Sequence, residues 1–143
     1  MRAPTAERAL VRALPGGRLH LQDGPIDVIL KAWGAKDAVE AAHDAAARRF
    51  ASILDELTSE LPELRRAMAD HPRATTPVAR RMTNACAPLA DEFITPMAAV
   101  AGSVADELLC AMCAAAPLDR AFVNDGGDIA IHVALDHRLT VGV

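Results

Sequence analysis

The feature that most constrains the fold is a long run of apolar residues that recur at three- and four-residue steps. The repeating positions are Val39, Ala42, Ala46, Phe50, Ile53, Leu54, Leu57 and Leu61. Charged residues such as Glu40, Asp44 and Arg48 fall between them, so the pattern predicts one amphipathic helix with a single apolar side. Gly34 precedes this helix and Pro62 ends it. Because its apolar side must be buried, we expect the helix to cover one face of a sheet.

Strands are predicted on both sides of this helix in the sequence. The predicted strands are residues 18–22, 26–33, 121–124, 128–133 and 139–143. Asp23-Gly24-Pro25 and Asp125-Gly126-Gly127 are typical of tight turns between strands. The predicted fold class is therefore α+β, with antiparallel hairpins in a sheet covered by helices. We expect residues 1–17 to be an N-terminal segment and residues 18–143 to form the domain.

Two further helices are predicted where a threonine precedes a proline, because threonine favours the N-cap and proline the first helical position. One starts at Thr76-Pro77 and runs to about Pro88; the other follows Thr95-Pro96 and runs to about Ala115. The second helix has an aliphatic side made of Val100, Val104, Leu108 and Met112. Its opposite side is small and partly polar, so that a backbone or a flat ligand can approach it closely; it comprises Ala99, Gly102, Ser103, Asp106, Cys110 and Cys113.

Composition excludes several classes of function. The 143 residues are 52% hydrophobic and 3% aromatic, so we expect one domain with a core of small and aliphatic side chains. A net charge of −4 provides no basic surface for nucleic acid. The N-terminus lacks the apolar stretch of a signal peptide, and the apolar segment 94–118 is interrupted by Asp106 and Glu107, which favours a buried helix over a membrane span. With three cysteines and no export signal, a cytoplasmic protein with reduced thiols is expected.

The turn that contains Asn124, Gly126, Gly127 and Asp128 is the first candidate binding site. Consecutive glycines permit positive φ and expose backbone N–H groups, while Asn and Asp side chains can hydrogen-bond the donors of a ring or a ribose. The same residues also suit a hairpin turn in which Asn and Asp cap their own backbone. Asp106 has two interpretations as well: it orients a bound ring, or it is a helix carboxylate that the helix dipole stabilises. The sequence leaves these alternatives open.

The remaining candidates are weaker. Thr95 and the helix start behind it could present N–H groups to a phosphate, or Thr95 could simply cap the helix. Cys110 and Cys113 are spaced as in a metal knuckle but lie inside an Ala-rich helix, so we expect buried core residues. His132 and His137 have no positioned carboxylate in the sequence. No metal site is predicted, the catalytic residues stay unknown, and whether the chain is an enzyme is left open.

Two segments, Ala99-Val-Ala-Gly-Ser-Val-Ala-Asp106 and Val123-Asn-Asp-Gly-Gly-Asp-Ile129, carry a resemblance to a known family. The first is similar to Ile-Ala-Lys-Gly-Tyr-Ala-Val-Asp and the second to Val-Asn-Leu-Gly-Gly-Asp-Ile. Both are motifs of the ApbE superfamily, the FAD:protein FMN transferases. Segments 24–27, 54–57, 77–82 and 94–102 resemble a divergent branch of that superfamily, so the resemblance covers residues 18–143.

The resemblance implies an α+β fold that holds a flavin, FAD or FMN, or a related heteroaromatic ligand. It favours a ligand site at the turn over a plain hairpin. Together with the candidates from the residues, the expected cofactor-binding residues are Thr95, Gly102, Asp106, Asn124, Gly126, Gly127 and Asp128. Ala101 stands where the transferases carry lysine, and the C-terminal half of the family pattern, with its magnesium-binding residues, is absent. We therefore expect a domain truncated at the C-terminus, in which magnesium binds only with a partner segment.

The leading expectation is thus an ApbE-like domain that binds a flavin or related heteroaromatic cofactor and needs a C-terminal partner chain for activity. One alternative is a non-catalytic interaction or assembly subunit, and another is an enzyme acting on a different small ring compound such as a pterin. We also expect a homo-oligomer or a complex with a complementary C-terminal chain, because an unpaired apolar strand at 139–143 would be an exposed edge.

Overall fold

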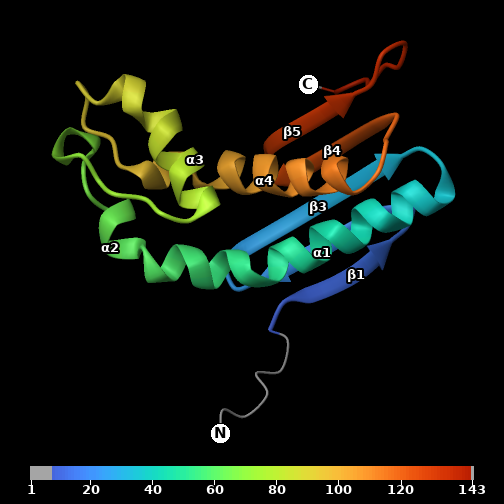
Figure 1. Ribbon diagram of the computed structural model, residues 1–143, viewed down its shortest axis with the longest axis horizontal. Helices are drawn as coiled ribbons and strands as arrows, with labels where there is room; N and C mark the ends of the chain where they lie inside the picture. Colours follow the sequence, from blue (N-terminus) through green and yellow to red (C-terminus); the bar gives the residue numbers. More distant parts are fainter. Residues whose placement is uncertain (1–7, 143) are drawn as a thin grey trace, which may run out of the picture.

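The computed structural model describes residues 8–142 and shows an α+β protein built from two layers (Figure 1). One layer is a five-stranded antiparallel sheet with the strand order β1-β2-β3-β4-β5. Its strands are β1 (Leu10–Leu14), β2 (Arg18–Asp23), β3 (Ile26–Trp33), β4 (Arg120–Asp125) and β5 (Asp128–Val133). The predicted fold class, a sheet of antiparallel hairpins covered by helices, is confirmed.

The helices form the second layer and cover one face of the sheet (Figure 1). They are α1 (Lys36–Ser59), α2 (Leu61–Leu64), α3 (Pro77–Cys86) and α4 (Val100–Ala115). Three short 3₁₀ turns join them: η1 (Met68–Asp70), η2 (Ala87–Leu89) and η3 (Pro96–Ala99). α1 and α4 lie side by side across the sheet, while α3 packs against α4 at the end where the β4–β5 turn lies.

The apolar side of α1 is buried, as its spacing predicts. Ala42, Ala46, Phe50 and Ile53 are at most 1% exposed and belong to the core shared with the sheet. Two of these positions are alanines, whose small side chains allow α1 to lie close to its neighbours. Close packing of this kind can fill the core although the chain has few aromatic residues. Leu54 differs from the prediction, because it is only partly buried and lines a pocket at the edge of the core.

The register of the sheet decides which residues can reach the helices. Val28 pairs with Asp125, and Asp125 pairs with Asp128 across the β4–β5 turn, so both aspartates point to the helix side. One position along, Asn124 pairs with Ile129 on the opposite, open face of the sheet. Two residues of one short motif, Asn124 and Asp128, are therefore directed to different faces.

Two segments differ from the sequence-based expectation. β1 was not predicted, because buried apolar residues do not alternate with exposed polar ones along this strand, whose first residue is Leu10. Residues 139–142 form no strand within the described part of the chain, although one was predicted at 139–143. They lie instead beside Trp33 on the open face of the sheet. The Arg120 guanidinium donates to the Arg138 carbonyl oxygen at 3.0 Å and holds this segment back against the strands.

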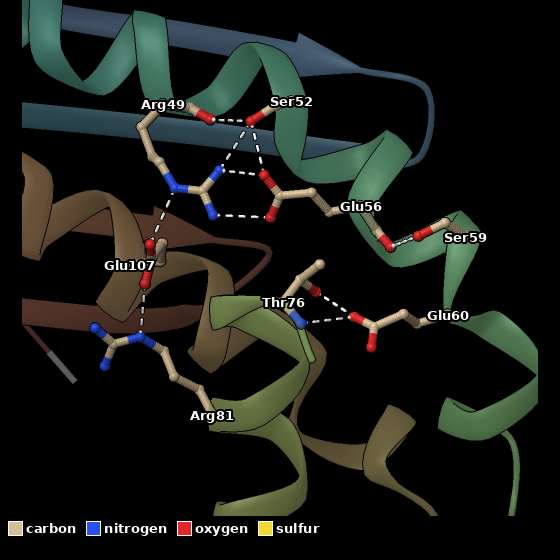
Figure 2. A network of polar contacts seen from close by, with 8 residues as sticks. All are labelled: Arg49, Ser52, Glu56, Ser59, Glu60, Thr76, Arg81 and Glu107. Atoms are coloured by element: carbon tan, nitrogen blue, oxygen red, sulfur yellow. Dashed lines mark hydrogen bonds and ion pairs between the residues drawn. The ribbon is translucent and has the colours of Figure 1, made fainter. Parts of the chain in front are cut away.

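The two predicted threonine N-caps form no side-chain cap. The backbone N–H and the hydroxyl of Thr76 instead donate to the carboxylate of Glu60 at the end of α1 (Figure 2). Partial burial opposes ionisation of Glu60, but hydrogen bonds from Thr76 and Thr75 outweigh it and lower its pKa. Glu60 therefore ties the end of α1 to the start of α3.

One helical run among the described residues, Pro96–Ala115, is long and apolar enough to cross a membrane by length and composition alone. The core helix of a soluble protein meets the same criterion. In this fold the aliphatic side of the run is packed, since Val104, Leu108 and Met112 are fully buried in the core.

Candidate functional site

A cleft of about 400 Å³ lies where the β4–β5 turn, the start of α4 and the end of α3 meet. Its lining residues are Arg81, Asn84, Ala85, Ala99, Gly102, Ser103, Asp106 and Asp128. Three of the residues predicted to bind a ligand, Gly102, Asp106 and Asp128, are thus brought together. The small side of the α4 helix opens into this cleft, as the sequence predicted.

The floor of the cleft is the surface of α4 itself. Ala99, Gly102 and Ser103 are spaced three and four residues apart, so they lie on one side of the helical run. A Cβ atom placed on Gly102 would lie 3.9 Å from Oδ2 of Asp128, so the helix and the β4–β5 turn approach each other closely here. With side chains this small, a flat molecule can lie almost against the helix backbone.

The polar groups of the cleft come from three elements. Asp106 on α4 and Asp128 on β5 are exposed carboxylates, and they supply only acceptors when ionised. Arg81 and Asn84 on α3 supply donors from the other wall. The cleft therefore suits a ligand that presents N–H groups toward the carboxylates and a carbonyl or similar acceptor toward α3.

Glu107 holds Arg81 in place at the wall of the cleft (Figure 2). Nε of Arg81 donates to Oε2 of Glu107 at 2.8 Å, which raises the pKa of Arg81. The other carboxylate oxygen, Oε1, accepts from Nε of Arg49 on α1 at 3.0 Å. Burial alone would raise the pKa of Glu107, but the hydrogen bonds from Arg81 and Arg49 outweigh it and lower this pKa. One carboxylate thus joins α1, α3 and α4 beside the cleft.

The network continues along α1. Both Nη atoms of Arg49 donate to the carboxylate of Glu56, each at 2.9 Å, and Nη1 also reaches the hydroxyl of Ser52 (Figure 2). A bidentate pair of this kind fixes the guanidinium plane as well as its position. Glu56 and Glu107 thus both hold the Arg49 guanidinium, and Glu107 also holds Arg81.

The other predicted binding residues do not line the cleft. Oδ1 of Asn124 accepts from the N–H of Gly127 at 2.8 Å, which is a cap within the turn. Gly126 and Gly127 have φ of 61° and 106°, and a Cβ on either would meet nothing within 4 Å. Thr95 precedes η3, and its carbonyl accepts from Ala98 N at 3.1 Å. These residues shape the backbone around the cleft rather than face a ligand in it.

Sequence reasoning missed the α3 wall. Arg81, Asn84 and Ala85 are three and four residues apart, so they share one side of the helix, next to the side of the buried Val78 and Met82, and this was visible in the sequence. What the sequence did not contain is the packing of that side against the start of α4. Asp125 was also missed as a lining residue, because it was assigned to the turn; it faces a second cavity on the other side of α4.

The cysteine prediction needs a correction. Cys86 is buried, but Cys110 is exposed and Cys113 is only partly buried, so the pair does not belong to the core. The cause is that this side of α4 faces the polar wall of α3, where Nη2 of Arg81 lies 3.3 Å from Sγ of Cys110. Within residues 8–142, no group of three or more His, Cys, Asp or Glu side chains is arranged to hold a metal ion.

A protein-family model described as AbpE bacteria matches residues 11–143. The chain belongs to the AbpE bacteria family. AbpE bacteria is a different family from ApbE, so the resemblance to the FAD:protein FMN transferases was wrong. No curated protein and no solved structure matches the chain.

The structure explains why the two motifs misled. In this AbpE bacteria protein, Gly126 and Gly127 are used for their positive φ and Asn124 for a cap, which are needs of a tight hairpin in any family. Gly102 lies where α4 faces Asp128, and a Cβ there would make only an ordinary van der Waals contact, 3.9 Å from Oδ2 of Asp128. Short motifs made of such residues report local backbone geometry rather than descent.

Proposed function

We propose that this AbpE bacteria protein binds a small planar heteroaromatic compound in the cleft between α3, α4 and the β4–β5 turn. The observation that carries the proposal is the placement of two carboxylates, Asp106 and Asp128, at a floor made of Ala99, Gly102 and Ser103. The small floor gives room for a flat ring, and the carboxylates accept hydrogen bonds from N–H groups at its edge.

The carboxylates of Asp106 and Asp128 favour pterin-like rings over flavin-like rings. A 2-amino-4-oxopteridine presents a ring N–H and an amino group side by side, and this pair matches the two oxygens of one carboxylate. An isoalloxazine ring presents a single N–H between two carbonyl groups, so it satisfies fewer of the acceptors. Arg81 and Asn84 face the cleft from α3 and can donate to a ring carbonyl.

Phosphate-bearing cofactors fit the cleft less well. FMN and FAD bring negative charge to a site that already has two carboxylates, and like charges at short range oppose each other. Arg81 offsets little of this repulsion, because its guanidinium is already paired with Glu107. We therefore favour the unphosphorylated ring, and pterin-like compounds over flavin nucleotides.

Calorimetric titration with a 2-amino-4-oxopteridine, riboflavin and FMN tests this proposal. We expect affinity to fall in that order, and we expect Asp128→Asn and Asp106→Asn each to weaken pteridine binding roughly tenfold through loss of a charge-assisted hydrogen bond. Asp70→Asn is the matched control, because Asp70 is exposed and lies away from the cleft. Unchanged affinity in both cleft variants, or no saturable binding of any of the three compounds, would contradict the proposal.

A second candidate function, an assembly subunit, is favoured by the open face of the sheet. Ile129, Ile131 and Val133 of β5 are 45%, 44% and 41% exposed, and Trp33 and Phe122 lie next to them on the same face. Adjacent exposed apolar residues on an outer strand are typical of a contact surface. We propose that two copies associate through this surface.

Light scattering on purified protein tests the second candidate. We expect a dimer that Ile131→Lys converts to a monomer. Leu89→Lys is the control, because Leu89 is similarly exposed but lies on η2. A monomer at high concentration, or a dimer that Ile131→Lys leaves intact, would rule out association through β5.

A further inference from the structure

A second cavity, of about 350 Å³, lies on the other side of α4 from the cleft. Leu54 and Leu57 of α1 and Leu61 and Leu64 of α2 form one wall, and Met97 and Val100 at the start of the α4 run form the other. Leu57 and Leu64 are buried, so the cavity reaches into the core. We call it the leucine pocket. Its volume falls in the range of cavities that hold small organic ligands, about 300–1,000 Å³.

Of the residues that the structure describes, Asp125 is the one charged residue that lines the leucine pocket. Among residues 8–142, no hydrogen bond or ion pair reaches its carboxylate. Burial raises the pKa of Asp125 to about 6, and the nearby carboxylates of Asp128 and Asp27 add to the shift. At neutral pH the pocket therefore contains a largely ionised carboxylate that the protein does not neutralise.

These two properties define the ligand. Apolar walls favour a hydrocarbon or aromatic body, because its burial removes apolar surface from water. A half-buried carboxylate without a partner favours a cation with N–H donors at one end of that body. An anion would be repelled, and a bare metal ion would find one carboxylate where it needs several oxygen ligands.

We propose that the leucine pocket binds a small organic amine with an apolar body, whose ammonium group pairs with Asp125. This site is independent of the heteroaromatic cleft. Ala101 lines the leucine pocket, whereas Ala99 and Gly102 line the cleft, so the first turns of the α4 run separate the two. Asp125 and Asp128, paired in register, each serve one of the two cavities.

Benzylamine and benzyl alcohol provide a matched pair of probes, because they share the ring and differ in charge. The full chain is titrated with each at pH 7.5 and followed by two-dimensional amide NMR. We expect benzylamine to bind at least roughly tenfold more tightly than the alcohol, with shifts at Leu54, Met97 and Asp125. Below pH 6 Asp125 takes up a proton, and the preference should disappear. No other titratable side chain among residues 8–142 lines the pocket. Asp27 of β3 and Asp128 of β5 are the charged groups whose repulsion acts on Asp125.

Two pairs of variants decide the outcome. Asp125→Asn should bring the two probes to within roughly threefold of each other, while Asp128→Asn should keep the preference. Ala101→Leu should fill the pocket and abolish binding of both probes, while Ala99→Leu should not. Circular dichroism of each variant checks the fold. Equal affinity of the two probes for the wild type, a preference that survives Asp125→Asn, shifts confined to the cleft, or no saturable binding of benzylamine would overturn the proposal.

Discussion

The two sides of the α4 helical run differ in chemistry although they share one backbone. Toward α3, small residues and two carboxylates form an open polar cleft. Toward α1 and α2, leucines and methionines enclose an apolar pocket with a single carboxylate, Asp125. Both sides receive an aspartate from the same β4–β5 turn. Helical positions only two residues apart, such as Ala99 and Ala101, thus line cavities of unlike chemistry.

Truncation to alanine should lower the stability far more in the core beneath the leucine pocket than in the pocket wall. Ile53 is fully buried, and we expect Ile53→Ala to lower the free energy of unfolding by about 3–4 kcal/mol. Leu54, one residue further, lines the pocket, so Leu54→Ala should cost only about 1 kcal/mol because the site is already open. Urea denaturation compares the two variants. Equal losses would mean that Leu54 is a core residue and that the pocket closes in solution.

On the cleft side of α4, we expect substitution of Glu107 to cause the largest loss of stability. Glu107→Gln removes the charge shared by Arg49 and Arg81, and we expect a loss of about 2 kcal/mol, below the range for fully buried pairs because Arg81 is partly exposed. Glu92→Gln is the control, because Glu92 is exposed. Thermal unfolding measures the difference. A Glu107→Gln variant as stable as the Glu92→Gln control would show that the three-helix network contributes little.

Asp125 should make the free energy of unfolding fall as the pH rises through the acidic range, whereas most carboxylates make it rise. Its pKa is about 6 in the folded protein and about 4 in an unfolded chain. The folded state therefore holds more protons between these values, and the Asp125 contribution to the free energy of unfolding falls as pH rises from about 4 to 6. Glu60 and Glu107 have lowered pKa values and act in the opposite direction at lower pH.

Denaturant unfolding of wild type and Asp125→Asn at several pH values between 4 and 7 isolates this contribution. The stability of wild type relative to the variant should decrease across the window and then level off. A constant difference would mean that the folded protein does not raise the pKa of Asp125.

The smallest effect is expected at the floor of the cleft. A Cβ on Gly102 meets only ordinary contact distance to Asp128, so Gly102→Ala should stabilise α4 by about 0.5–1 kcal/mol. Gly127→Ala should instead destabilise the protein, because its φ of 106° is unfavourable for alanine. Thermal unfolding of the pair checks this. A destabilised Gly102→Ala variant would show that a Cβ at position 102 lies closer to the Asp128 carboxylate in solution than the 3.9 Å of this structure.

Much of the fold could be predicted from local patterns. The α1 spacing, the two glycine turns and the unlike sides of α4 are each properties of one segment, and each was recovered. β1 was missed because its residues are exposed, and the strand at 139–143 was wrongly predicted because a side-chain contact, from Arg120 to the Arg138 carbonyl, decides its path.

The candidate site also contains residues that local patterns predicted and residues that only the packing of the elements brings there. Gly102, Asp106 and Asp128 were predicted and meet in one cleft, while Arg81 was missed because only the packing of α3 against α4 brings it there. Asn124 was grouped with Asp128 by sequence, yet strand alternation directs it to the opposite face. A position in a motif does not say which face a residue serves until the register of the sheet is known.

The most direct test of the account is an amide NMR titration of the full chain with a 2-amino-4-oxopteridine. We predict saturable shifts concentrated at Gly102, Ser103, Asp106 and Asp128, with little change at Leu54 or Asp125 in the leucine pocket. Shifts concentrated on the open sheet face around Trp33 and Phe122, or none that saturate, would contradict the assignment of the cleft as the heteroaromatic binding site.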